Sequence, residues 1–183
     1  MRIVEAIPYT PPANWNHLLC DARSTPPRVA AVLKTSNGEV CYTDLEPTSA
    51  LAEIFIMKKA GDNNIMALEM LAVVVGICTF LPQTENTFTQ VWTDNTGVQG
   101  VMGKGAAKTH NLNLAAHALW LIAARHKMGM FIDRVPTDDN IADGPSREHY
   151  GLLRNHYKAK WQEPVISEEF LTNFQDPGVP SCS

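Results

Sequence analysis

The sequence has few cysteines, and their spacing fits no common cross-linked or metal-bound scaffold. Cys20, Cys41, Cys78 and Cys182 lie far apart in 183 residues, so they match neither a zinc site nor a disulfide framework. Three of the four stand in apolar runs, which predicts buried, reduced thiols. The histidines are scattered without a spacing that closes on one helix face, so we expect no zinc.

The sequence also lacks a long apolar run without charge. The longest nearly uncharged stretch, residues 65–81, contains Glu69, and the N-terminus shows no secretion signal. We therefore expect an intracellular protein of the cytoplasm or nucleus, with no membrane partner.

Positive charge is not in excess, because the formal net charge at pH 7 is −4. Such a chain is not expected to hold nucleic acid by bulk electrostatics alone. That objection weakens if several acidic residues are metal ligands, since bound divalent cations would cancel their charge where a phosphate must approach.

What is present fits one globular domain, with 45% hydrophobic and 19% charged residues. Proline-rich ends predict an extended lead-in over residues 1–14 and a C-terminal extension and tail over 161–183, which leaves the domain at 15–160. Turn residues separate the first three strand-like runs, which is typical of an antiparallel meander. We expect five strands, at residues 17–22, 28–34, 39–44, 87–93 and 130–135. We expect helices at residues 47–59, 65–80, 96–102 and 113–128, with a closing helix from about Pro145.

Glu69 is the most informative single residue. The run around it, residues 65–78, carries no other charge, so the carboxylate is expected to be buried. Burying a lone carboxylate costs several kcal/mol unless it is paired, hydrogen-bonded or bound to a metal. We therefore expect a cationic partner, the alternative being a surface glutamate at a thin part of the core.

Three further acids follow apolar strand-like runs. Asp21 and Asp94 each end such a run, and adjacent strands would bring them together, although either alone is typical of a turn or a helix cap. With Glu69 they would form an oxygen-ligand site for Mg²⁺ or Mn²⁺. Asp143 follows the fifth strand, where a helix cap is the alternative, and spacing does not separate it from Asp138 and Asp139.

The order of the four acids resembles the ribonuclease H family, which places a strand Asp, a first-helix Glu, a fourth-strand Asp and a late Asp in that sequence. Three strings more narrowly resemble the ribonuclease H domains of reverse-transcribing elements: LEMLA at 68–72, WTDN at 92–95 and NIADGPSR at 140–147. The last string, of the form N-x-A-D-x-x-S-R, selects Asp143. The resemblance covers residues 15–155.

This resemblance implies an α/β ribonuclease H-like fold, with a five-stranded mixed sheet whose first three strands are antiparallel and which helices flank. It implies hydrolysis of the RNA strand of RNA/DNA hybrids with two Mg²⁺ ions, for which Mn²⁺ would substitute. The catalytic metal ligands would be Asp21, Glu69, Asp94 and Asp143, with Asp21 and Asp94 contacting both ions. Besides the hybrid, a reverse transcriptase polymerase domain in the same polyprotein is an expected partner.

The loop after the fifth strand lacks the histidine that many members carry there, and Asp138 or Asp139 is a candidate proton relay in its place. Contacts to 2′-hydroxyls and phosphates would select the hybrid with little sequence preference. Candidates for these contacts are Asn95, Thr96, Asn64, Arg23 and Arg147, with Lys104 and Lys108 as further phosphate contacts.

Two other functions remain open at this point. A catalytically silent, retroelement-derived binding or scaffold domain would have little reason to retain Glu69 in an apolar helix. An integrase, transposase or resolvase on the same fold would typically place its glutamate late in the chain, whereas the late acid here is Asp143.

Overall fold

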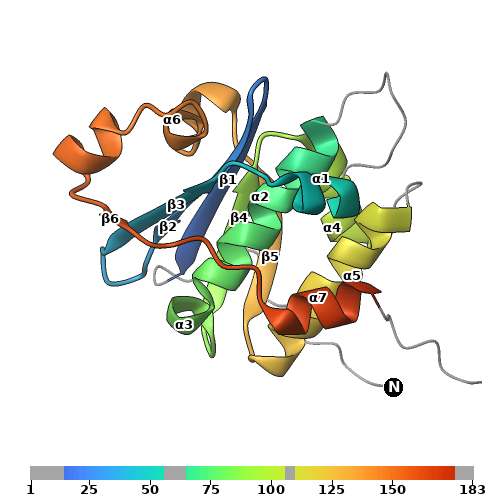
Figure 1. Ribbon diagram of the computed structural model, residues 1–183. Helices are drawn as coiled ribbons and strands as arrows, with labels where there is room; N and C mark the ends of the chain where they lie inside the picture. Colours follow the sequence, from blue (N-terminus) through green and yellow to red (C-terminus); the bar gives the residue numbers. More distant parts are fainter. Residues whose placement is uncertain (1–14, 56–64, 106–109, 176–183) are drawn as a thin grey trace, which may run out of the picture.

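The computed structural model describes residues 15–55, 65–105 and 110–175, so the expected lead-in, Asn64, Lys108 and Cys182 lie outside the described residues. One sheet organises these residues (Figure 1), in the order β5-β4-β1-β2-β3-β6. Its strands are β1 (Asn16–Ser24), β2 (Pro27–Lys34), β3 (Val40–Leu45), β4 (Phe88–Thr93), β5 (Gly129–Arg134) and β6 (Lys160–Trp161).

The first three strands form the antiparallel meander that turn residues predict, while β4 runs parallel to β1 and β5 parallel to β4. The mixed α/β class is thereby confirmed. The count of five strands was wrong, because β6 adds a sixth by pairing parallel to β3. Since β6 has only two residues and both are exposed, it leaves no hydrophobic alternation to read.

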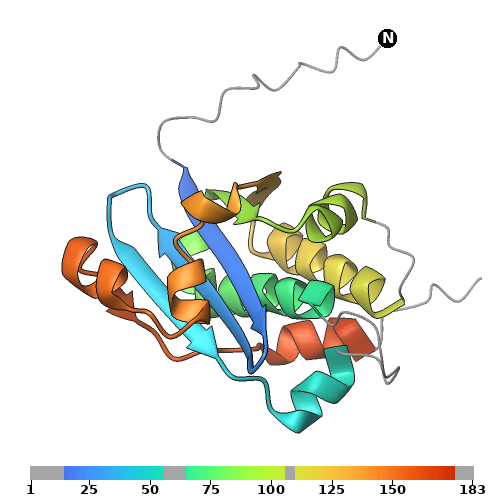
Figure 2. The ribbon, with the colours of Figure 1, turned by 90° about the horizontal axis from the view of Figure 1, so that it is seen from above.

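Helices cover both faces of the sheet (Figures 1 and 2). The larger layer consists of α2, which packs on the sheet, together with α1, α5 and α7. The smaller layer, on the other face, contains α6 and η2. The α-helices are α1 (Ser49–Phe55), α2 (Ile65–Thr79), α3 (Leu81–Thr84), α4 (Thr96–Lys104), α5 (His110–Arg125), α6 (Asp143–Ser146) and α7 (Glu168–Gln175). A 3₁₀ turn, η1 (Thr137–Asp139), precedes α6, and a π-helix, η2 (Leu152–His156), follows it.

Helix α2 is apolar on every side and is buried from Leu68 to its last residue. It packs on β1 and β2, and Gly76 permits this close approach, because a Cβ there would lie 2.9 Å from the Cβ of Ala31. Because the helix is buried on every side, Glu69, near its N-terminal end, cannot reach solvent.

The closing helix expected from about Pro145 is present as α6, but it is short. Helix α6 ends at Ser146, and Glu148 has a φ of 64°, a left-handed conformation that a right-handed helix cannot contain. The chain also folds back tightly here, because a Cβ on Gly144 would lie 2.8 Å from the carbonyl oxygen of His149. The segment therefore turns before η2, whose Leu153 is buried in a smaller cluster with Tyr42.

The residues beyond 160, expected as an extension, contribute to the main core. Phe170 and Phe174 of α7 stack on Phe55 of α1, with ring centroids 5.9 and 5.1 Å away. The hydroxyl of Ser167 accepts a 3.1 Å hydrogen bond from the backbone N–H of Phe170, as an N-cap does. Helix α7 thus closes the helical layer against α5.

The structure also bears on the cysteines and on the apolar runs of the sequence. Cys20, Cys41 and Cys78 are buried free thiols, as their apolar surroundings predict. In the three described stretches, no helix combines the length and apolarity needed to cross a bilayer.

Candidate metal centre

Three of the four expected carboxylates meet at one edge of the sheet. Asp21 lies on β1, Glu69 on α2 and Asp94 directly after β4, and one oxygen from each lies within 4.8 Å of the other two. Strands β1 and β4 are parallel neighbours in the register Leu19↔Trp92, so Asp21, within β1, and Asp94, directly after β4, lie at the same level along the sheet. The topology therefore produces the cluster that the sequence pattern predicts.

Glu69 is 4% exposed, and its two carboxyl oxygens have different surroundings. Oε1 accepts a 3.2 Å hydrogen bond from the backbone N–H of Ala22, whereas Oε2 is buried without a hydrogen-bond partner. Burial, followed by the charges of Asp21 and Asp94, raises the pKa of Glu69 to about 9. No cationic side chain among residues 15–55, 65–105 and 110–175 pairs with it, so the expected cationic partner is not a protein group there.

Asp21 is also 4% exposed, and its Oδ2 accepts a hydrogen bond from the hydroxyl of Ser146 on α6. Burial is the main reason that the pKa of Asp21 rises to about 6. The Ser146 hydrogen bond opposes this rise in pKa, while the charges of Asp94 and Asp143 add to it. Two neighbouring buried carboxyl groups with raised pKa values form a site that takes up either protons or a cation in preference to carrying bare negative charge.

Asp94 is partly exposed, and a residue of η1 contacts its side chain. Its Oδ2 accepts a 3.0 Å hydrogen bond from the hydroxyl of Thr137. The next residue, Asn95, caps α4, because its Oδ1 accepts hydrogen bonds from the backbone N–H groups of Gly97 and Val98 at 2.9 and 3.1 Å. No side chain or backbone group in the described ranges accepts from its side-chain NH₂, which leaves that NH₂ for the expected substrate contact, and the exposed Thr96 is the next residue.

Asp143 lies outside the group of three. It begins α6, its side chain is 34% exposed, and its Oδ1 accepts a 2.6 Å hydrogen bond from Nε of Arg147. Its charge contributes to the raised pKa of Asp21, which places it within electrostatic reach of the cluster. A cleft of about 400 Å³ beside it is lined in part by Asp138, Arg147 and Leu152.

The exposed Asp138 and Asp139 lie on η1, and only Asp138 lines the cleft, so the two candidate proton relays are not equivalent. Lys104 is exposed at the end of α4.

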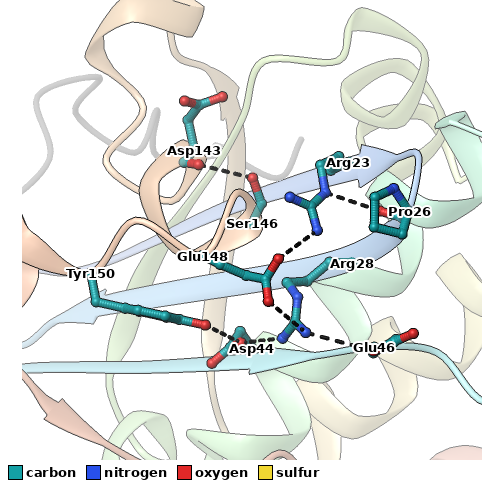
Figure 3. Close-up of polar contacts among 9 residues, drawn as sticks. All are labelled: Arg23, Pro26, Arg28, Asp44, Glu46, Asp143, Ser146, Glu148 and Tyr150. Atoms are coloured by element: carbon teal, nitrogen blue, oxygen red, sulfur yellow. Dashed lines mark hydrogen bonds and ion pairs between the residues drawn. The ribbon is translucent and has the colours of Figure 1, made fainter.

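Arg23 belongs to a polar network that fastens the chain after α6 to the sheet (Figure 3). The carboxylate of Glu148 lies between two guanidinium groups, 3.0 Å from Nη2 of Arg23 and 3.4 Å from Nη2 of Arg28. Arg28 also lies 2.6 Å from Asp44 of β3, which accepts a 2.9 Å hydrogen bond from Tyr150. A substrate contact by Arg23 would therefore compete with Glu148.

Three residues near the site were missed by sequence reasoning: Ser146, Thr137 and Asn140. Asn140 and Ser146 belong to the string at 140–147, from which only Asp143 was predicted as a site residue. The same string could therefore have indicated both of them. Buried Asn140 donates from Nδ2 to the carbonyl oxygen of Cys20 at 2.9 Å and accepts from the backbone N–H of Ala142 at 3.2 Å. Thr137 carries no comparable signal, because its contact depends on how η1 folds over Asp94.

Comparisons with known proteins identify the fold. No family profile and no curated protein sequence matches the chain. Among solved structures, ribonuclease H1 from Halobacterium salinarum NRC-1 is similar with a TM-score of 0.50 and 14% identity, over 74% of this chain and 96% of that one. The N-terminal ribonuclease H domain of a Mycobacterium tuberculosis protein, solved as a maltose-binding protein fusion, gives a TM-score of 0.49 and 15% identity, over 76% and 99%. The likeness to the Halobacterium salinarum structure shows that the chain has a ribonuclease H-like fold.

Proposed function

We propose that this chain is an endonuclease that hydrolyses the RNA strand of RNA/DNA hybrids, as part of or derived from a retroelement reverse transcriptase. One observation carries the proposal: the partnerless, buried Oε2 of Glu69 lies on a ribonuclease H-like fold, in a carboxylate cluster with Asp21 and Asp94. A cluster like this is poorly suited to stabilising a fold by itself, because three acids repel one another.

The donor set fits a divalent metal. Carboxylate oxygens are the ligands that Mg²⁺ and Mn²⁺ prefer, and the unsatisfied Oε2 supplies a ready coordination position. Asp21, Glu69 and Asp94 would hold Mg²⁺, with Mn²⁺ as substitute, and Asp143 would complete a site for a second ion. Such ions, when bound, supply a water nucleophile at neutral pH and neutralise charge on the scissile phosphate and the leaving oxygen.

The chain's own residues orient this site. Ser146 fixes the rotamer of Asp21, Thr137 fixes that of Asp94, and Arg147 restrains Asp143. Arg147 and the free NH₂ of Asn95 would contact the substrate backbone, with Thr96 at a 2′-hydroxyl. Asp138, exposed at the cleft, would pass protons to solvent, and Asp139 is the second candidate for that role.

The retroelement origin is supported by the strings at residues 68–72, 92–95 and 140–147. A polymerase domain in the same polyprotein is the partner that this origin implies. An acidic domain of this kind would gain from a neighbour with a basic surface.

Cleavage of an end-labelled RNA/DNA hybrid in Mg²⁺ or Mn²⁺ tests the proposal. Wild type should cut the RNA strand, Asp94→Asn should abolish cutting, and Asp133→Asn, an exposed acid on β5, should cut normally. A wild type that neither cuts nor binds metal would identify a silent scaffold domain instead. Faster cutting of duplex DNA than of hybrid would indicate an integrase-type or resolvase-type nuclease.

A further inference from the structure

The segment that contains η2 and β6 carries charge opposite to that of the whole chain. Residues 147–161 hold four of the 15 lysines and arginines and one of the 19 acidic residues, a net charge of +3 in a chain of net charge −4. The rest of the chain is correspondingly acidic, at −7. Positive charge is therefore concentrated on one short stretch.

Within this stretch and beside it, four cations form what we call the basic surface: Lys34, Arg154, Lys158 and Lys160. Arg154, Lys158 and Lys160 are exposed, and Lys34 at the end of β2 is partly so. In the described part of the chain, no carboxylate forms an ion pair with Lys34, Arg154 or Lys158, while Lys160 lies 2.6 Å from Glu39. The charges of Lys34, Arg154 and Lys158 are thus available to bind an anionic ligand.

Aromatic rings hold two of these cations in place. Nζ of Lys34 lies 4.6 Å from the ring centroid of Tyr157, and the Arg154 guanidinium lies 4.7 Å from that of Tyr150. Nε of Arg154 also donates to the Tyr42 hydroxyl at 3.2 Å. A cation over a ring keeps its charge while it loses conformational freedom, so less entropy remains to be lost on binding.

The basic surface lies next to the candidate active site along the chain, because η2, which contains Arg154, begins in the lining of the cleft. The cleft beside Asp143 is lined by Arg147 and by Leu152, the first residue of η2. Buried Leu153 seats η2 on the same face of the sheet as α6, where Figures 1 and 2 show the two segments together. A π-helix is rare and is frequently found at functional positions.

We propose that the basic surface binds the phosphate backbone of the nucleic acid duplex whose RNA strand lies at Asp21, Glu69 and Asp94. This inference rests on the proposed function and adds where the duplex leaves the site: over η2 and across the end of β2. A duplex backbone fits better than an acidic protein, because two of the cations are held in place over aromatic rings and η2, which carries Arg154, begins in the lining of the cleft. Most of the electrostatic attraction would come from this surface, since the remainder of the chain repels phosphate.

Two lysines provide a matched test. Lys158 and Lys127 are both exposed and have φ values of 52° and 50°, so replacing either by Gln removes the same charge from the same backbone conformation. The measurement is the affinity for a fluorescent RNA/DNA hybrid in EDTA across a salt series. Lys158→Gln should weaken binding several-fold at low salt and reduce the slope of log K against log salt by about 0.9, the value of one phosphate contact. Lys127→Gln should leave both unchanged.

Equal slopes for the two variants, or no binding by wild type at low salt, would overturn the inference. So would equal affinity for polyglutamate of matched charge, which would indicate a protein partner. Binding is measured without metal, so it is independent of cleavage. If the salt slope depends on Lys158 but the wild type never cuts the hybrid, the proposed function is wrong and the basic surface still binds nucleic acid. If the wild type cuts the hybrid but the two variants give equal salt slopes, the proposed function stands and the basic surface is not a binding site.

Discussion

Nδ2 of Asn140 donates a buried 2.9 Å hydrogen bond to the carbonyl oxygen of Cys20, across 120 residues of sequence. Cys20 directly precedes Asp21 on β1, and Asn140 lies three residues before Asp143. Together with the hydrogen bond from Ser146 to Asp21, this contact therefore sets the position of the late acid relative to the first one. It also satisfies a backbone carbonyl that has no access to water.

Replacing Asn140 by Ala should lower the free energy of unfolding by about 1–3 kcal/mol, the usual cost of leaving a buried polar group unsatisfied. Urea unfolding in EDTA measures this change. Asn155→Ala, an exposed position on η2, is the control and should differ from wild type by less than about 0.5 kcal/mol. Equal stability of the two variants would contradict a structural role for the Asn140 amide.

Replacing Ser146 by Ala should raise the pKa of Asp21 above its value of about 6. The reason is that the Ser146 hydrogen bond favours the ionised form, whereas burial and the charges of Asp94 and Asp143 already disfavour it. A carboxyl-carbon NMR titration of the metal-free protein would follow Asp21 directly. Ser24→Ala, at the exposed end of β1, should leave the titration unchanged.

The sequence was most informative where residue type conflicts with environment. Glu69 could be identified because no other charge shares its helix, and Asp21 and Asp94 because each directly follows an apolar run of the sequence. Ser146 and Thr137 could not be assigned in this way, since a hydroxyl beside a carboxylate is common on any surface. Their contacts arise only when η1 and α6 fold back over β1 and β4.

The stability of the metal-free protein should fall as pH rises from about 4.5 to about 9. Glu69 has an ordinary pKa of 4.5 and a folded-state pKa of about 9, so in this window the folded state binds the extra proton. Raising the pH removes that proton and with it the stability, a loss complete above the folded pKa. Asp21 adds a smaller loss between pH 3.8 and about 6.

Urea unfolding in EDTA at pH 5, 7 and 9 measures this dependence. Glu69→Gln should flatten it above pH 6, while Glu53→Gln, exposed on α1, should retain it. Mg²⁺ at pH 8 should stabilise wild type and not Glu69→Gln, because only the former offers the full ligand set. A wild type with flat stability over this range would contradict the burial of an unpaired Glu69.

Gly144→Ala should weaken metal binding by displacing α6. An added Cβ would lie 2.8 Å from the carbonyl oxygen of His149, a backbone atom, so the turn itself must move. Calorimetric titration with Mn²⁺ measures the effect. Gly151→Ala, where a Cβ meets nothing within 4 Å, is the matched control and should bind Mn²⁺ as wild type does.

The turn at Gly144 and Glu148 also explains where the fold could not be predicted. A Pro at the start and polar residues through 149 suit a helix. The left-handed Glu148 instead ends α6, with a 2.8 Å backbone hydrogen bond from His149 to Gly144 and with ion pairs from Glu148 to Arg23 and Arg28. The main strands and the long helices, by contrast, follow from the hydrophobic pattern, and for α2 from the length of its apolar run. They start or stop within about three residues of the expected positions wherever both ends are described.

The stacking of Phe170 and Phe174 of α7 on Phe55 has a practical consequence for anyone who trims this chain. Cutting after residue 160, where the sequence pattern places the end of the domain, would strip two aromatic side chains from the helical layer and leave the α1 side of the core bare. Such a fragment should self-associate and enter inclusion bodies. Expression boundaries that retain residues through 175 would keep both rings in the core.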